Sequence, residues 1–104
     1  MATTVPEIKP TTQDFLRALA SETRQQILQL FAGGIELTVG EVAERAGLGQ
    51  STASEHLSVL RRGGLVQATR DGKAVRYRVD SARIGTELDK LKAYLTVCCP
   101  PSCA

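Results

Sequence analysis

The three cysteines of the chain, Cys98, Cys99 and Cys103, all lie in its last seven residues, "CCPPSCA". Thiolates are soft ligands, and this set has no neighbouring His, Asp or Glu. Zn(II) in a structural site prefers four ligands in a tetrahedron, whereas a trigonal-pyramidal ion such as As(III) or Sb(III) needs only three. The tail therefore favours a three-thiolate site for a thiophilic trivalent ion.

The same three thiols allow other chemistry. Pro100-Pro101 ends any helix and forces an extended turn, which would let Cys103 fold back over the Cys98-Cys99 pair. In a redox or persulfide sensor, Cys103 would instead resolve an oxidised Cys98 or Cys99. A Cd(II), Pb(II) or Zn(II) site with one outside ligand is a further alternative, and an inert solvated tail is the plain one.

Composition indicates one small soluble domain. The chain has 104 residues, with 42% hydrophobic and 23% charged residues. Its start, "MATTVPEIKP", lacks the basic and apolar regions of a signal peptide, and no apolar run is long enough to span a membrane. We expect a cytoplasmic protein with reduced thiols and no membrane partner.

Catalytic residues are scarce in this sequence. His56 is its only histidine, and the sequence shows neither an acid/base cluster nor a glycine-rich phosphate loop. We therefore predict that the protein is not an enzyme.

Three segments follow from the pattern along the chain. Residues 1–10, with two prolines, read as a flexible arm, residues 11–97 as one folded domain, and residues 98–104 as a cysteine-rich ligand-binding tail. The domain begins with two helical patterns. The first starts at Thr11, and the second follows a Ser21 cap and runs to Gly33-Gly34.

The next two helices form a helix-turn-helix pattern. Thr38 and Glu41 make a capping box at the start of the first, and Gly47 suits its end. After a short turn, "QSTASEHLSVLRR" buries apolar residues at helical spacing and presents small polar residues on its other face. Small polar side chains let a helix enter a major groove and bond to base edges.

A basic hairpin comes directly afterwards. Asp71-Gly72 is a two-residue type I′ turn signal, and apolar residues alternate with Arg76 and Arg78 in the second strand. Seven of the 13 basic residues lie between Arg61 and Arg83. A basic hairpin after such a helix is typical of the wing of a winged helix-turn-helix.

The last helical pattern begins at Ser81 and carries a narrow apolar stripe. Its members, Ile84, Leu88, Leu91 and Leu95, are spaced i, i+4, i+7 and i+11. Such a stripe on a terminal helix predicts a dimer seam, with packing on its own domain as the alternative. The predicted fold class is mostly α with a small β-hairpin (α+β), a winged helix-turn-helix with a helical dimer interface.

The chain resembles the ArsR/SmtB family of metal-sensing repressors. The resemblance covers roughly residues 15–95 and rests on "LASETRQQILQLF" and "STASEHLSVLRRGGLVQATRDGKAVRYRV". It implies a homodimer bridged by the first and last helices, which binds a pseudo-palindromic operator and leaves it when an inducer binds. The implied DNA contacts are Gln50, Ser51, Thr52, Ser54, His56, Arg70, Lys73 and Arg76. His56 could equally be a half-buried structural residue.

The chain departs from many arsenic-responsive members of the family at one place. Those members carry a cysteine pair in the helix before the turn, where this chain has Thr38 and Gly40 in "ELTVGE". Other members use a C-terminal Cys-Cys plus a third Cys, and this tail is similar to that variant with a shorter spacer. We therefore expect As(III), Sb(III) or an organoarsenical to be the inducer, bound by Cys98, Cys99 and Cys103, with no catalytic cofactor.

Overall fold

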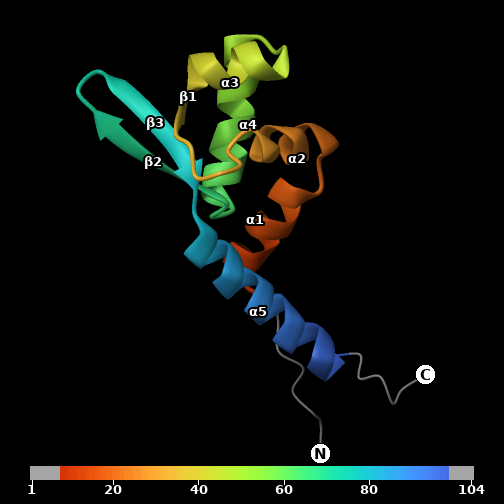
Figure 1. Ribbon diagram of the computed structural model, residues 1–104. Helices are drawn as coiled ribbons and strands as arrows, with labels where there is room; N and C mark the ends of the chain where they lie inside the picture. The colour runs from red at the N-terminus through yellow and green to blue at the C-terminus, as the bar shows by residue number, and fades with distance from the viewer. Residues whose placement is uncertain (1–7, 99–104) are drawn as a thin grey trace, which may run out of the picture.

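The computed structural model describes residues 8–98 and shows helices around a small antiparallel sheet (Figure 1). The elements are α1 (Pro10–Leu19), α2 (Glu22–Gln29), β1 (Leu37–Thr38), α3 (Val39–Ala46), α4 (Gln50–Arg62), β2 (Val66–Asp71), β3 (Ala74–Val79) and α5 (Ser81–Cys98). The predicted winged helix-turn-helix fold is confirmed. Helix α1 takes in Pro10 and α5 takes in Cys98, so the folded elements extend one residue beyond 11–97 at each end.

The predicted helix caps are present. The Ser21 hydroxyl accepts a hydrogen bond from the Arg24 amide at the start of α2. At the start of α3, the Glu41 amide donates to the Thr38 hydroxyl, and the Thr38 amide donates to Glu41 Oε1 at 2.9 Å. Gly47 ends α3 with φ 67°, a left-handed conformation that glycine adopts without strain. These caps fix the ends of the helices that carry the site.

The sheet differs from the prediction in two details. It has three strands in the order β1-β3-β2, and the two-residue strand β1 was not predicted. In the hairpin Asp71 pairs with Ala74, so the turn residues are Gly72 and Lys73 and not Asp71-Gly72. Gly72 has a positive φ of 63°, but Lys73 does not have a positive φ, so the turn is not the predicted type I′, which requires positive φ at both central residues. The correction places Lys73 at the tip of the wing.

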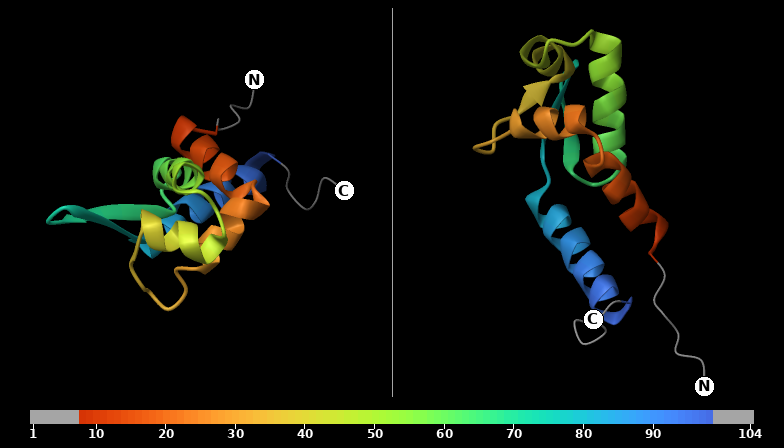
Figure 2. Two further views of the ribbon diagram at one scale, coloured as in Figure 1. Left: turned by 90° about the horizontal axis from the view of Figure 1, so that it is seen from above. Right: turned by 90° about the vertical axis from the view of Figure 1, so that its right-hand side faces the viewer.

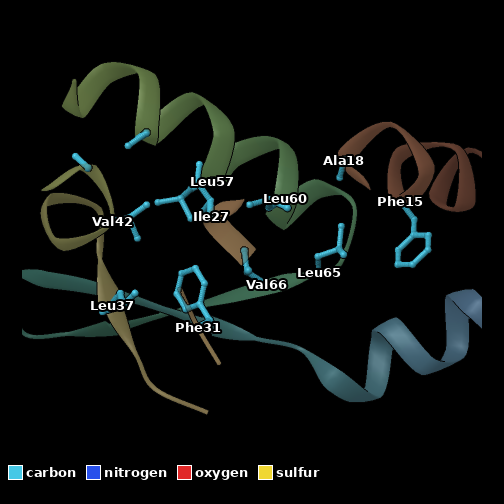
Figure 3. Close-up of a cluster of buried hydrophobic side chains, with 12 residues drawn as sticks. Phe15, Ala18, Ile27, Phe31, Leu37, Val42, Leu57, Leu60, Leu65 and Val66 are labelled. Carbon is cyan, nitrogen blue, oxygen red and sulfur yellow. The ribbon is translucent and has the colours of Figure 1, made fainter. Parts of the chain in front are cut away.

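The hydrophobic core lies between α1 to α4 and the base of the sheet. Figure 3 shows Leu57 and Leu60 of α4 pointing toward Ile27 of α2 and Val42 of α3. The side chains of these residues are completely buried. Helix α5 contributes no buried apolar side chain to this cluster. The partly buried Ile84, near the start of α5, packs against this cluster, and the helix then extends away from it (Figure 2).

Helix α5 is joined to α1 by a buried polar contact. The Thr12 hydroxyl donates a 2.8 Å hydrogen bond to the Glu87 carboxylate, which is only 2% exposed. The Lys90 ammonium lies 3.5 Å from the other carboxylate oxygen. A buried carboxylate needs such partners, because without them its desolvation is costly. The bond therefore holds the first and last helices against each other.

No helix within residues 8–98 is both long enough and apolar enough to cross a membrane.

Candidate nucleic-acid interface

The outward face of α4 presents three of the predicted DNA-contacting residues. Gln50, Ser51 and Ser54 are exposed in the first turns of α4, whereas Ala53 and Leu57 of the same helix are buried. Gly49 precedes the helix as its N-cap and has no side chain of its own. The two serines are small, so α4 could approach a groove closely at these positions.

Thr52 and His56 lie on a different flank of α4, one turn apart. His56 is half-buried, and its Nδ1 lies 3.4 Å from a guanidinium nitrogen of Arg24 in α2. The same guanidinium donates to the carbonyl oxygens of Ala18 and Arg17 at the end of α1. His56 thus contacts the guanidinium that links α1 to α2, and its predicted contact with DNA stays a prediction.

The wing carries the remaining predicted contacts. Arg70 and Lys73 are exposed on the hairpin, and Arg76 is half-buried, its Nε 3.8 Å from a carboxylate oxygen of Asp71. Since both side chains of this pair still reach solvent, the pair contributes little at this distance and leaves the arginine able to reach a phosphate. In Figure 1 the hairpin projects from the body on one side of α3 and α4.

The carboxyl group of Glu41, in the first turn of α3, has a lowered pKa. Donation from the Thr38 backbone amide is the main cause, and it lowers the pKa of Glu41 below its ordinary value of 4.5. The Thr38 side chain and the positive charges of Arg45 and Arg76 act in the same direction. The carboxylate therefore stays ionised beside the start of α3.

The wing contact gives a prediction. Replacing Arg76 by Ala should weaken DNA binding about three- to tenfold at low salt and reduce the slope of log K against log salt by about one, because one phosphate contact is lost. Fluorescence anisotropy at several salt concentrations measures both. Arg17→Ala removes an exposed arginine of α1 and serves as the control. An unchanged slope in Arg76→Ala would remove this residue from the interface.

The cysteine site is only partly within the described residues. Cys98 is the last residue of α5 and is exposed. Cys99, Cys103 and the predicted Pro100-Pro101 turn lie outside the described residues. Within residues 8–98, no group of three His, Cys, Asp or Glu side chains is placed to hold a metal ion. The convergence of the three sulfurs therefore stays a prediction.

The predicted dimer stripe lies largely in solvent. Leu88 and Leu95 are 48% and 49% exposed, whereas Ile84 and Leu91 are half-buried. Exposed leucines at this spacing on one side of a helix are typical of an interface with another chain. The alternative, that the stripe packs only on its own domain, does not agree with the exposure of Leu88 and Leu95.

Comparisons with known proteins define the class first. A family model described as a helix-turn-helix domain matches residues 10–67. The solution structure of a homodimeric winged helix-turn-helix DNA-binding domain from Mycobacterium bovis, described as a possible ArsR-family regulator, is 36% identical. It has a TM-score of 0.63, and the match covers 80% of this chain and 79% of that one. The chain belongs to the ArsR family of DNA-binding winged helix-turn-helix transcription regulators.

Two further relatives are both named as regulators of transcription, one as a repressor and the other as an activator. A probable mercury resistance operon repressor of Streptomyces lividans is 47% identical over 74 residues, 71% of this chain and 58% of the relative. The transcriptional activator HlyU of Vibrio cholerae is 40% identical over 76 residues, 73% of this chain and 69% of the relative. The match thus spans little more than half of the mercury repressor. Both relatives are regulators of transcription rather than enzymes.

Proposed function

We propose that the protein is a homodimeric repressor that binds a pseudo-palindromic operator and leaves it when As(III) or Sb(III) binds Cys98, Cys99 and Cys103. The observation that carries this proposal is the position of Cys98, an exposed residue at the end of the helix whose leucine stripe is open to solvent. A ligand bound there would act on the helix that joins two subunits. A change in how the two α5 helices pack would then change the position of the two α4 helices relative to each other.

Operator binding by this dimer follows from the fold. Two copies of α4 would enter successive major grooves about 34 Å apart. The wings, with Arg70, Lys73 and Arg76, would add salt-sensitive affinity at their flanks. A coupling of about 1–3 kcal/mol between inducer and DNA would lower operator affinity about 5- to 150-fold.

Trivalent arsenic is favoured by the donor set. The tail offers three thiols and no harder ligand close by in the sequence, which suits a three-coordinate thiophilic ion. A solved structure described as a possible transcriptional regulator for arsenical resistance is 32% identical to this chain, with a TM-score of 0.66 and coverage of 79% and 84% of the two chains. Its description supports the same class of inducer.

Redox sensing by the same thiols is the second candidate. It is favoured by one relative, since HlyU of Vibrio cholerae has been solved in a form described as reduced, at 37% identity and a TM-score of 0.62. In this case peroxide or a persulfide would release the DNA without any metal. Both candidates need the cysteines, so the test must separate metal uptake from oxidation.

Native mass spectrometry of the reduced protein with arsenite tests the proposal. We expect one arsenic per subunit with the loss of three protons, because each coordinating sulfur binds as a thiolate. Replacing Cys98, Cys99 or Cys103 singly by Ser should weaken arsenic uptake and blunt release of the operator while leaving DNA binding intact. Ser102→Ala, a neighbouring change that keeps every thiol, is the control.

Three outcomes would change the proposal. Absence of arsenic uptake, with release by peroxide alone, would move the function to redox sensing. Preferential uptake of Zn(II) in a parallel titration would move it to another metal. Dependence on only two of the three cysteines would point to an organoarsenical, which needs two thiolates.

A further inference from the structure

A shallow depression opens between the starts of α3 and α4. It has a volume of about 450 Å³ and is lined by Val39, Gln50, Ser51 and Ser54. Three of these residues belong to the α4 face already assigned to DNA. Val39 comes from α3 and is the only apolar residue in the lining. No role in DNA binding was predicted for it.

Val39 is held in a fixed position. It is the first residue of α3, directly after Thr38, whose side chain and backbone make the capping box. Val39 also packs against the hydrophobic core while staying partly exposed. A β-branched side chain in a helix has one strongly preferred rotamer. The depression therefore has a rigid apolar wall beside three polar residues.

The residue types that line the depression indicate which part of DNA it would contact. Base edges in the major groove present hydrogen-bond donors and acceptors, and thymine adds the only methyl group of the four standard bases. The hydroxyls and the amide of the lining suit polar base edges, and Val39 suits a methyl. None of the four lining side chains is charged.

We propose that Val39 is a specificity-determining residue that receives the C5 methyl of one thymine in each operator half-site. The proposal rests on the proposed function, since it requires that the outward face of α4 lies in a major groove. The residues of α4 alone do not specify this thymine, so the proposal adds one base to what is expected of the operator. A thymine would be preferred at one position, and removal of its methyl would weaken binding.

Deoxyuridine scanning tests this proposal directly. The operator is first obtained by selecting tight-binding duplexes from a random pool, and each thymidine is then replaced singly by deoxyuridine, which lacks only the methyl. At one position per half-site we expect affinity to fall about fourfold, the value for burying one methyl group. All other replacements should leave the affinity nearly unchanged.

A protein variant then identifies the residue responsible. Val39→Thr keeps the branched shape but replaces one methyl by a hydroxyl, so it should bind the thymine and deoxyuridine operators equally well at that position. Val39→Ile keeps an apolar wall and should retain the preference for thymine. Val97→Thr makes the same change on an exposed part of α5 and is the matched control. Thermal unfolding of each variant checks that it is folded.

The results separate the two proposals. A protein that selects no sequence from the random pool would overturn operator binding and, with it, the role of Val39. Sequence-specific binding with no methyl-dependent position would overturn only the role of Val39. A methyl effect that persists in Val39→Thr would also overturn it, because another side chain would then contact the thymine.

Discussion

A variant in which Leu88 and Leu91 are both replaced by Asp is expected to sediment as a monomer and to bind its operator about a hundredfold more weakly. Leu88 is almost half exposed in the single chain, and Leu91, one turn further, is partly exposed beside it. Burying two carboxylates in an apolar dimer interface costs desolvation free energy, and an apolar interface offers no charged partner to offset that cost. A monomer also loses the second half-site, and linked sites commonly gain a factor of about 100–10,000.

The control for this prediction is Thr86→Asp, an exposed position on the opposite side of α5. It adds a carboxylate to the same helix and should leave the dimer intact. Sedimentation velocity measures the assembly, and anisotropy with operator DNA measures the affinity. A Leu88→Asp, Leu91→Asp variant that stays dimeric would place the seam on another face of the molecule.

Replacing Gly63 or Gly85 by Ala is expected to change the free energy of unfolding in opposite directions. A Cβ atom on Gly63 would lie 2.8 Å from the backbone oxygen of Asp14 and 2.9 Å from the Cβ atom of Ala18. Gly63→Ala should therefore force α4 away from α1 and lower the free energy of unfolding by about 1–3 kcal/mol. In contrast, Gly85 lies in α5 with nothing within 4 Å, and Gly85→Ala should raise it by about 0.5–1 kcal/mol.

Urea unfolding at one fixed protein concentration measures both changes, since the stability of a dimer depends on concentration. Both variants replace a glycine by alanine and so reduce the conformational entropy of the unfolded chain in the same way. The difference between their stabilities therefore measures the steric clash between α1 and α4 at position 63. Equal stabilities of Gly63→Ala and the parent protein would mean that the two helices can separate without loss.

Local signals made most of the fold predictable from the sequence. The capping box at Thr38, the Ser21 cap and the C-terminal Gly47 each act through neighbours within a few residues, so the sequence alone locates the ends of the helices. Periodicity likewise identified Ala53 and Leu57 as buried and placed Ser54 on the outer face. The outward face of the candidate site follows from the same helical pattern.

Features that depend on distant residues were not predictable in this way. Strand β1 is only two residues long and exists because Leu37 and Thr38 meet β3, about 40 positions later. The buried bond between Thr12 and Glu87 joins residues 75 positions apart, and neither looks unusual in its own helix. The contact of Arg24 with His56 is equally non-local. Such contacts are set by tertiary packing, for which a single sequence carries no periodic signal.

Thr38 ties together two parts that the sequence presents as separate. It pairs with Arg76, midway along β3 of the wing, and it also caps α3, which packs on α4. A hinge motion of the wing would disturb both the strand pairing and the cap at Thr38, so we expect the wing and the helix-turn-helix to move together. An inducer bound at the end of α5 would then act by rotating whole subunits against each other. In that case, inserting or deleting one base pair between the half-sites should affect binding as strongly as the inducer does.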